Sequence, residues 1–274
     1  MKAMILAAGL GTRLRPLTDT RPKALVEING RSLLEITVRR LRTFGITEAI
    51  INVHHFADMV ADYLKTKNNF NMRIEISRED DVILDTGGGL KKAAWFFQEE
   101  LSHSSPSPDV SAVPDEPFLL HNVDVISTVD LAAMLQFHTE HRALATLAVQ
   151  SRDSSRQLLF NDELQLSGRR AEARSSTPSV ERPLVTSHWP LPESAKSSPF
   201  CPLAFSGIHV ISPRLLPLLT ESGPFSIIDS YLRLSSQGQK ILAFRHDNSY
   251  WRDLGKPADL AQAALDLQQN VALS

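Results

Sequence analysis

Residues 6–23 read Leu-Ala-Ala-Gly-Leu-Gly-Thr-Arg-Leu-Arg-Pro-Leu-Thr-Asp-Thr-Arg-Pro-Lys, and this stretch decides the fold. The apolar run 3–8 leads directly into Gly9 and Gly11, and such a run is typical of a strand buried on both faces. Glycines at the end of a strand let backbone N–H groups approach an anion closely. Open α/β sheets bind their ligands at the carboxyl ends of strands. The stretch therefore predicts an α/β fold with an anion-binding loop after its first strand.

Two common phosphate-binding motifs do not fit this loop. The dinucleotide fingerprint requires a third glycine at the position of Leu14, and the P-loop requires Gly-Lys-Ser/Thr, which residues 6–23 lack. Two cations remain in the loop. Arg13 offers a planar fork to phosphate oxygens, and Lys23 is a compact positive charge. The loop therefore indicates a phosphate site that is neither a plain Rossmann dinucleotide site nor a P-loop.

Strand and helix patterns alternate along the first half of the chain. We predict strands over 3–8, 49–53, 72–77 and 118–123, and helices over 34–45, 56–67, 91–101 and 131–141. In the second half we predict strands over 143–149 and 203–211, a hairpin over 158–166, and helices over 227–234 and 260–269. The alternation predicts a Rossmann-like three-layer sandwich with a mainly parallel mixed sheet.

The overall composition excludes several classes of protein. The 274 residues are 42% hydrophobic and 22% charged, which is typical of a globular chain with a large core. The net charge of −2 provides no bulk field, so we expect neither nucleic acid nor a membrane as a partner. The single cysteine excludes an internal disulfide framework. Because the apolar start of the chain is a strand pattern and not a signal peptide, we expect a cytoplasmic protein.

Two segments interrupt the alternation of strands and helices. Residues 102–117 contain five serines and four prolines, and residues 168–202 contain seven serines and six prolines. Such composition favours mobile surface insertions over domain linkers. We therefore expect one domain over 1–274.

The spacing of the loop residues resembles that of a known family. Gly9, Gly11, Thr12, Arg13, Pro16, Pro22 and Lys23 follow the pattern G-x-G-T-R-(x)2-P-(x)5-P-K. This pattern resembles the signature of the sugar-1-phosphate nucleotidyltransferases, which are also called nucleotide-sugar pyrophosphorylases. The resemblance implies the nucleotidyltransferase type of the predicted fold, with a nucleotide-binding half over 1–130 and a sugar-binding half over 131–274. It also implies a monomer or homodimer.

Four later stretches resemble the same family. Residues 85–89 (Asp-Thr-Gly-Gly-Gly), with Lys92 three residues on, are most similar to the N-acetylmuramate-1-phosphate uridylyltransferases of cell-wall recycling. Residues 119–124 end in an aspartate after an apolar strand, although Val123 stands where the family usually has glycine. Residues 251–257 (Trp-Arg-Asp-Leu-Gly-Lys-Pro) resemble a second aspartate motif. Residues 204–210 resemble the strand beside the sugar.

The resemblance implies a role for each matching residue. The catalytic residues would be Arg13, Lys23, Asp124 and Asp253, of which Asp124 and Asp253 would bind Mg²⁺. The nucleotide would contact Leu6, Ala7, Ala8, Gly9, Gly11, Thr12, Arg13, Lys23, Gly87 and Gly88. The glycine triplet would form a turn that orients the base. The sugar would contact Asn122, Gly207 and Lys92, and the lactyl carboxylate of a muramate would pair with Lys92, Arg152 or Arg245.

The implied reaction transfers a nucleotide from a nucleoside triphosphate to a sugar 1-phosphate and releases pyrophosphate. UTP with N-acetylmuramate 1-phosphate is the pair that the glycine triplet favours. A mannose-1-phosphate guanylyltransferase and a glucose-1-phosphate thymidylyl- or uridylyltransferase stay open as alternatives. A non-catalytic regulatory homologue that binds sugar nucleotides is a further alternative, but such a protein would lose one of the four charged catalytic residues, and all four are present here.

Overall fold

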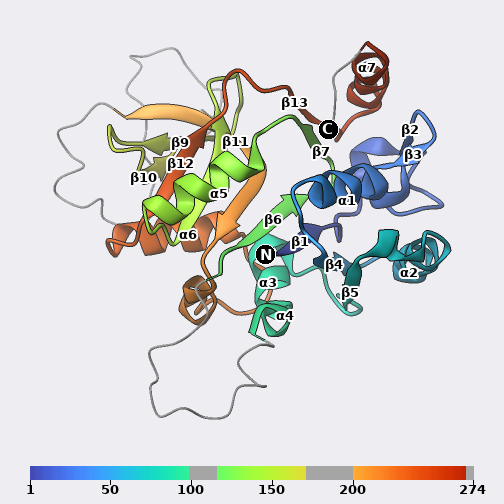
Figure 1. Ribbon diagram of the computed structural model, residues 1–274, viewed down its shortest axis with the longest axis horizontal. Coiled ribbons are helices and arrows are strands. Elements are labelled where there is room, and N and C mark those ends of the chain that lie inside the picture. Colours follow the sequence, from blue (N-terminus) through green and yellow to red (C-terminus); the bar gives the residue numbers. More distant parts are fainter. Residues whose placement is uncertain (99–115, 171–199, 270–274) are drawn as a thin grey trace, which may run out of the picture.

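The computed structural model describes residues 1–98, 116–170 and 200–269 (Figure 1). A nine-stranded mixed sheet runs through the molecule, with β10 and β9 at one end and β5 at the other (Figure 1). Its strands are β1 (Lys2–Leu6), β4 (Glu48–Val53), β5 (Arg73–Arg78), β6 (Phe118–Asn122), β8 (Ala145–Gln150), β9 (Gln157–Phe160), β10 (Leu166–Arg169), β11 (Cys201–Ile211) and β12 (Ile241–Arg245). The helices are α1 (Leu33–Thr43), α2 (Ala57–Thr66), α3 (Asp85–Lys92), α4 (Ala94–Gln98), α5 (Leu131–Glu140), α6 (Ile227–Ser236) and α7 (Pro257–Gln268).

The central strands are apolar throughout because both of their faces are covered. In β1, Ala3 and Ile5 belong to one hydrophobic core, whereas Met4 between them belongs to the other. Successive side chains of a strand point to opposite faces, so a continuous apolar run supplies both cores. Helices α1, α2, α5 and α7 contribute to the first core, and α3, α4 and α6 to the second. These two cores make the three layers that the sequence predicts.

The sheet is parallel at its centre and antiparallel at one side. β1 pairs in parallel with β4 and β6, and β4 pairs in parallel with β5. β11 runs antiparallel to β6 along residues 208–211 and to β9 along residues 201–204. β6 and β9 thus pair with the same edge of β11, but along different residues. The sheet therefore opens between β6 and β9 near Gly207. This opening forms part of the candidate sugar site described below.

Two small antiparallel ribbons lie outside the main sheet. β7 (Val125–Ser127) pairs with β13 (Trp251–Asp253), and Asp253 lies opposite Val125. β2 (Glu27–Ile28) pairs with β3 (Arg31–Ser32) just before α1. The first ribbon connects the loop after β6 to a segment close to the end of the chain. It therefore joins two stretches that the sequence places far apart.

Most of the predicted elements are confirmed, with three corrections. The glycine triplet is not a turn before a helix: Gly87, Gly88 and Gly89 lie inside α3, which begins at Asp85. The sequence analysis also missed β12, which pairs in parallel with β8. The predicted insertion 168–202 is too long at both ends. Its start overlaps β10, which contains Gly168, and its end overlaps β11, which begins at Cys201. Residues 171–199 of that insertion, and residues 102–115 of the other, lie outside the described residues.

The three glycines of α3 allow this helix to pack closely against its neighbours. A Cβ on Gly88 would lie 2.7 Å from the carbonyl oxygen of Gly223, and a Cβ on Gly89 would lie 2.8 Å from Asn52. A Cβ on Gly87 would overlap the ring of Phe225. The cost of glycine in a helix is thus offset by contacts that a side chain would prevent.

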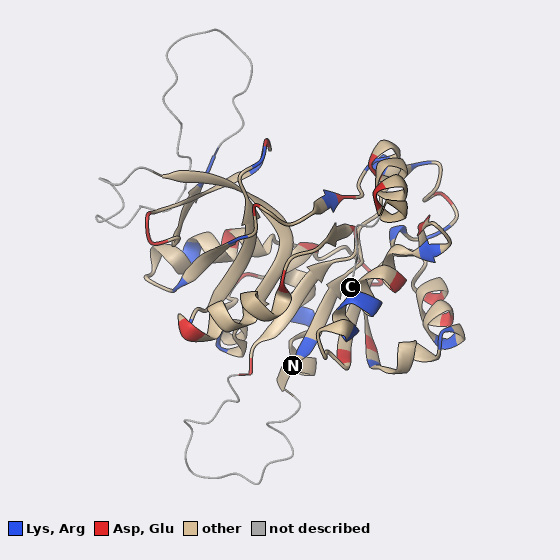
Figure 2. Ribbon diagram, turned by 45° about the horizontal axis from the view of Figure 1, so that its top comes forward, with Lys and Arg blue, Asp and Glu red and all other residues tan. Residues whose placement is uncertain are grey.

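Charged side chains of both signs are interspersed over the described elements, as Figure 2 shows. None of the described helices is both long and apolar enough to cross a membrane.

Candidate active site

A cavity of about 430 Å³ lies at the carboxyl ends of β1, β4 and β6. Its lining includes Leu6, Ala7, Ala8, Gly9, Gly11, Thr12, Arg13 and Lys23, and these are the loop residues that the sequence analysis assigned to the nucleotide. Asn52, Ile83, Asp85, Thr86, Asn122, Val123, Asp124, Arg156 and Gly255 complete the lining. The position matches the ligand site of open α/β sheets. We call this cavity the loop cavity.

The shape of the anion-binding loop depends on the backbone conformation of Gly11 and on one hydrogen bond from Thr18. Gly11 has a φ of +63°, a left-handed conformation that favours glycine. The Thr18 hydroxyl donates a hydrogen bond of 2.9 Å to the carbonyl oxygen of Gly11. Thr18 is buried beneath the loop, so the bond is shielded from water. The loop backbone is thus fixed before any phosphate binds.

A buried polar chain connects the loop to the opposite wall. The backbone N–H of Ala7 donates to Asn52 Oδ1 at 2.8 Å, and Asn52 Nδ2 donates to Glu79 Oε1 at 2.8 Å. The other carboxylate oxygen of Glu79 accepts from the backbone N–H of Leu84 at 2.8 Å. Leu84 precedes α3, so Asn52 and Glu79 fix the spacing between the loop and the start of α3. The sequence analysis assigned neither residue.

The two predicted metal ligands come together through the β7–β13 ribbon. Asp124 immediately precedes β7, Asp253 ends β13, and the backbone N–H of Leu254 donates to the Asp124 carbonyl at 2.8 Å. Lys23 Nζ donates to Asp124 Oδ2, so three of the four predicted catalytic residues meet at this ribbon. Burial raises the pKa of Asp253 above its ordinary value, and the negative charge of Asp124 raises it further, while Lys23 and Arg13 oppose the shift.

The carboxylate pair fits a divalent cation. Asp253 Oδ1 is buried and has no hydrogen-bond partner among the described residues. Two close carboxylates, one of them incompletely satisfied, gain from a shared cation because it relieves their mutual repulsion. Over the described ranges, no group of three or more acidic, histidine or cysteine side chains is placed to hold a metal. The remaining ligands would thus have to come from phosphate oxygens and water, as is usual for Mg²⁺.

Arg13 reaches the same ribbon from the other side. A Cβ at Gly255 would lie 2.5 Å from Arg13 Nη2 and 2.7 Å from Asp253 Oδ1. The guanidinium of Arg13 therefore occupies space that only glycine leaves open. This contact brings all four predicted catalytic residues into one place.

We expect Gly255→Ala to impair catalysis without unfolding the protein. The added methyl group would displace either the Arg13 guanidinium or the Asp253 carboxylate. We expect turnover to fall by about tenfold or more, because small displacements of positioned charges are costly. Steady-state rates of pyrophosphate release measure the effect. The thermal unfolding midpoint, measured on the same samples, separates this effect from a loss of folding. A wild-type rate in Gly255→Ala would contradict the assigned role of Gly255.

A second cavity, of about 650 Å³, adjoins the loop cavity. Asn122 and Arg156 line both cavities. The second cavity opens where β6 and β9 separate along β11, and its lining includes Gly207 and Asp253. Gly207 has a φ of +76°, and a Cβ there would lie 2.9 Å from Asn122 Nδ2. Asn122 and Gly207, which are both predicted to contact the sugar, thus lie side by side. We call this space the sugar cavity.

Four arginines line the sugar cavity. They are Arg152, Arg156, Arg169 and Arg170, whereas Asp253 is the only carboxylate in the described lining. Arg152 lies 3.6 Å from the centroid of the Trp251 ring and donates to the Phe205 carbonyl at 2.7 Å. Burial lowers the pKa of Arg152, while the charge of Asp253 partly opposes this. Arg169 is paired with Asp229 at 2.7 Å.

Several predicted site residues lie elsewhere. Gly87 and Gly88 do not line either cavity, and both of their N–H groups donate to the Phe225 carbonyl, so they are not an exposed turn for a base. Lys92 ends α3 and donates to the Arg78 carbonyl outside both cavities. Arg245 is paired with Asp247 at 2.8 Å and also lies outside. Of the three proposed partners for a lactyl carboxylate, only Arg152 lines the sugar cavity.

Other residues of the site have no role predicted from the sequence. Asp85 and Thr86 line the loop cavity, although the adjacent glycines drew the assignment. Thr86 Oγ1 accepts a hydrogen bond of 3.0 Å from the backbone N–H of Ile227, which fixes its position. Arg156 immediately precedes β9 and Arg170 immediately follows β10, and the pairing of β9 with β10 and β11 brings them to the site.

The amino-acid sequence is similar to those of known nucleotidyltransferases. The family described as nucleotidyl transferase matches residues 2–158. The N-acetylmuramate alpha-1-phosphate uridylyltransferase of Caulobacter vibrioides is 30% identical over 265 residues, which are 96% of this chain and 95% of that protein. A UTP–glucose-1-phosphate uridylyltransferase of Synechocystis sp. is 26% identical over 96% of this chain and 62% of its own length.

A solved structure shares the fold. The putative glucose-1-phosphate thymidylyltransferase from Bacillus anthracis superposes with a TM-score of 0.72 at 18% identity, and the match covers 99% of this chain and 96% of that one. At this identity the likeness concerns the fold. It supports the predicted α/β architecture with a mixed, mainly parallel sheet.

Proposed function

Because this chain belongs to the nucleotidyl transferase family, as a sugar-1-phosphate nucleotidyltransferase, we propose that it transfers UMP from UTP to N-acetylmuramate 1-phosphate. The observation that carries the choice of sugar is the arginine-rich lining of the sugar cavity. A lactyl carboxylate adds a negative charge that glucose and mannose phosphates lack, and guanidinium groups bind carboxylates well. The choice of uridine rests on the Caulobacter relative.

The proposed reaction needs no covalent enzyme intermediate. A phosphate oxygen of the sugar 1-phosphate attacks the α-phosphorus of UTP, the bond to the β-phosphate breaks, and pyrophosphate leaves with the electron pair. The protein then acts by positioning and by stabilising negative charge. Arg13 would hold the β- and γ-phosphates, and Lys23 would stabilise charge near the α-phosphate. The fixed N–H groups around Gly9 and Gly11 would complete the phosphate cradle.

Asp124 and Asp253 would hold Mg²⁺ at the border between the two cavities. When bound, the ion would neutralise phosphate charge, as metal ions do in phosphoryl transfer. Asp124 also holds the Lys23 ammonium beside the loop cavity before substrate arrives. Asn122, which lines both cavities, would contact the sugar next to this border.

The proposal includes the wider setting of the reaction. We infer one domain over 1–274, with residues 1–130 serving mainly the nucleotide and 131–274 mainly the sugar. The division is not strict, because Asn122 lines both cavities and because Arg156 and Gly255 line the loop cavity. We also infer a cytoplasmic enzyme of cell-wall recycling that acts as a monomer or homodimer.

Pyrophosphate release across a matrix of substrates tests the proposed function. UTP, GTP and dTTP would each be combined with the 1-phosphates of N-acetylmuramate, glucose and mannose, with and without Mg²⁺. We expect release with UTP and N-acetylmuramate 1-phosphate only when Mg²⁺ is present. Release mainly with UTP and glucose 1-phosphate would favour the activity named for the Synechocystis relative. Nucleotide binding with no release in any combination would favour a non-catalytic homologue.

We expect Arg170→Gln to lower selectivity for the acidic sugar. Arg170 lines the sugar cavity, and among the described residues its guanidinium donates only one hydrogen bond, of 3.2 Å, to Gln157 Oε1. Loss of one charged hydrogen bond should lower kcat/KM for N-acetylmuramate 1-phosphate by about tenfold. The value for N-acetylglucosamine 1-phosphate, which lacks the lactyl group, should change little. Arg156→Gln is the parallel test, and an equal loss for both sugars in both variants would contradict carboxylate recognition.

A further inference from the structure

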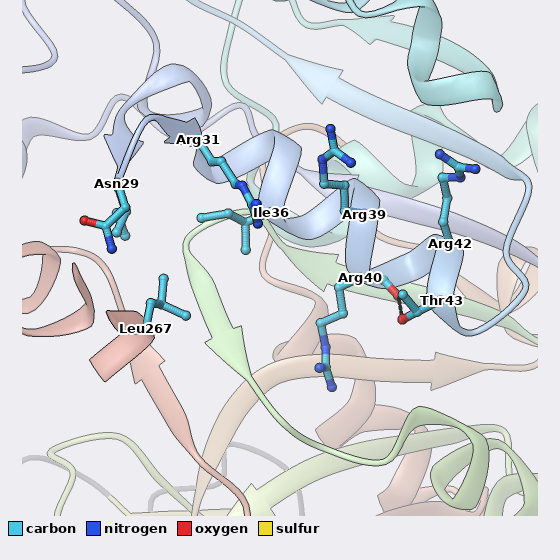
Figure 3. Close-up of a pocket in the computed structure, with 9 residues that line it drawn as sticks. Asn29, Arg31, Ile36, Arg39, Arg40, Arg42, Thr43 and Leu267 are labelled. Carbon is cyan, nitrogen blue, oxygen red and sulfur yellow. Dashed lines mark hydrogen bonds between the residues drawn. The ribbon is translucent and has the colours of Figure 1, made fainter. Parts of the chain in front are cut away.

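A third cavity, of about 680 Å³, lies away from the loop and sugar cavities. Its walls are the β2–β3 hairpin, α1 and α7 (Figure 3). Ile28, Ile36 and Leu267 provide an apolar part of the lining. It shares no residue with the linings of the other two cavities. We call it the α1 cavity.

The α1 cavity is positively charged. Arg31 of the hairpin and Arg39, Arg40 and Arg42 of α1 line it, and its lining contains no aspartate or glutamate. Arg39 is paired with Glu35 at 2.8 Å. Neither Arg31 nor Arg42 forms an ion pair with any carboxylate of the described residues. Three of the four cations therefore lack a carboxylate partner of their own.

Arg40 is the unusual member of this set. Its side chain extends from α1 to the side opposite Arg39 and Arg42 (Figure 3), and the residue is only 5% exposed. Arg40 Nη2 donates to the Val129 carbonyl at 2.5 Å, but Nε is buried without a partner. Burial lowers the pKa of the Arg40 guanidinium to about 10, and the charge of Asp130 only partly opposes this. Arg40 is still a cation at neutral pH, so a buried charge lies in the wall with incomplete compensation.

Buried arginines are usually compensated by an anion. Arg31 extends from the hairpin toward α1 and Ile36 in Figure 3, so an arginine from each of two walls borders the same space. Guanidinium groups bind phosphate oxygens through paired hydrogen bonds. The volume is in the range of small-ligand sites. The apolar side chains Ile28, Ile36 and Leu267 could cover the uncharged part of such a ligand.

We propose that the α1 cavity is a second anion site that binds a small phosphorylated compound, with its anionic groups at Arg31 and Arg42, the two exposed arginines without a carboxylate partner among the described residues, and with Arg40 as a buried charge in the wall. This site is separate from the proposed catalytic site, because Arg13, Lys23, Asp124 and Asp253 all lie outside its lining. A ligand there would contact α1, which also donates a hydrogen bond from Arg40 to the carbonyl of Val129, between β7 and α5.

Residue-resolved chemical modification tests the proposal. Phenylglyoxal modifies accessible arginines, and mass spectrometry gives the rate at each one, with inorganic phosphate, pyrophosphate or citrate present at equal ionic strength. We expect phosphate and pyrophosphate to slow modification of Arg31 and Arg42 by about tenfold, and citrate to protect them much less. Arg73 is the internal control, because it is exposed and lines none of the three cavities.

A pair of matched variants makes the result specific. Arg31→Gln/Arg42→Gln should lose one pyrophosphate-binding event by calorimetry and keep the other, whereas Arg73→Gln/Arg245→Gln should keep both. Unchanged modification of Arg31 and Arg42 with every anion would overturn the proposal, and so would equal slowing of Arg73. Equal protection by citrate would overturn the preference for phosphate. Protection of Arg13 without protection of Arg31 would overturn this inference and leave the proposed function intact.

Discussion

Arg13→Ala should lower turnover by about 10²-fold or more, because it removes a preorganised cation from the phosphate site. The Arg13 guanidinium lies within the space left by Gly255 and beside Asp253, so its position is fixed by the fold. We expect folding to survive, since Arg13 is an exposed residue. Rates of pyrophosphate release under saturating substrates, together with the thermal unfolding midpoint, measure the two effects.

Arg15→Ala is the matched control for this change. Arg15 lies two residues further along the same loop, but its side chain is exposed and paired with Asp19 at 3.3 Å. It does not line the loop cavity. We expect rates within about twofold of the wild type, since exposed ion pairs contribute little. If both variants turned over at wild-type rates, the assignment of Arg13 to the phosphates would be wrong.

Asp253→Asn and Asp124→Asn should both lower turnover by about 10²-fold or more, yet change stability in opposite directions. Asp124→Asn removes the carboxylate partner of the buried Lys23 ammonium, which should lower the free energy of unfolding by about 2 kcal/mol. Asp253→Asn removes a buried carboxylate that is repelled by Asp124, so it should raise the free energy of unfolding when no metal is present. Urea denaturation of the metal-free protein measures both changes.

The pH dependence of the Asp253→Asn effect follows from the raised pKa. In the unfolded chain the carboxyl titrates near its ordinary value of 3.8, whereas in the folded protein its pKa is higher. The folded state therefore holds the proton longer, and stability falls as the pH rises from 3.8 through the folded pKa. The gain from Asp253→Asn should be complete above the folded pKa and absent well below pH 3.8. A gain that is constant with pH would show that charge is not its cause.

Mg²⁺ with nucleotide gives an independent readout of the same pair. A ligand at 100 times its dissociation constant stabilises the folded state by about 2.7 kcal/mol. We expect such a shift in the wild type and a much smaller one in Asp253→Asn. An equal shift in both proteins would exclude Asp253 as a metal ligand.

The elements that depend on local patterns could be predicted from the sequence. The apolar run before Gly9 and Gly11 predicted a buried strand, and the two glycines with Arg13 and Lys23 predicted a phosphate loop at its end. These features lie within a short stretch, so composition and spacing specify them directly. The structure confirms the strand and places both cations at one cavity.

What lies opposite the loop depends on contacts between segments that are far apart in the sequence. The pairing of β7 with β13 brings Asp253 to Asp124, and the hairpin of β9 and β10 brings Arg156 and Arg170 to the sugar cavity. The glycine triplet shows the converse error: its role is close packing of α3 against Phe225, Gly223 and Asn52, and no local pattern distinguishes such a helix from a turn. Contacts between distant segments depend on strand register and packing, which local propensity does not encode.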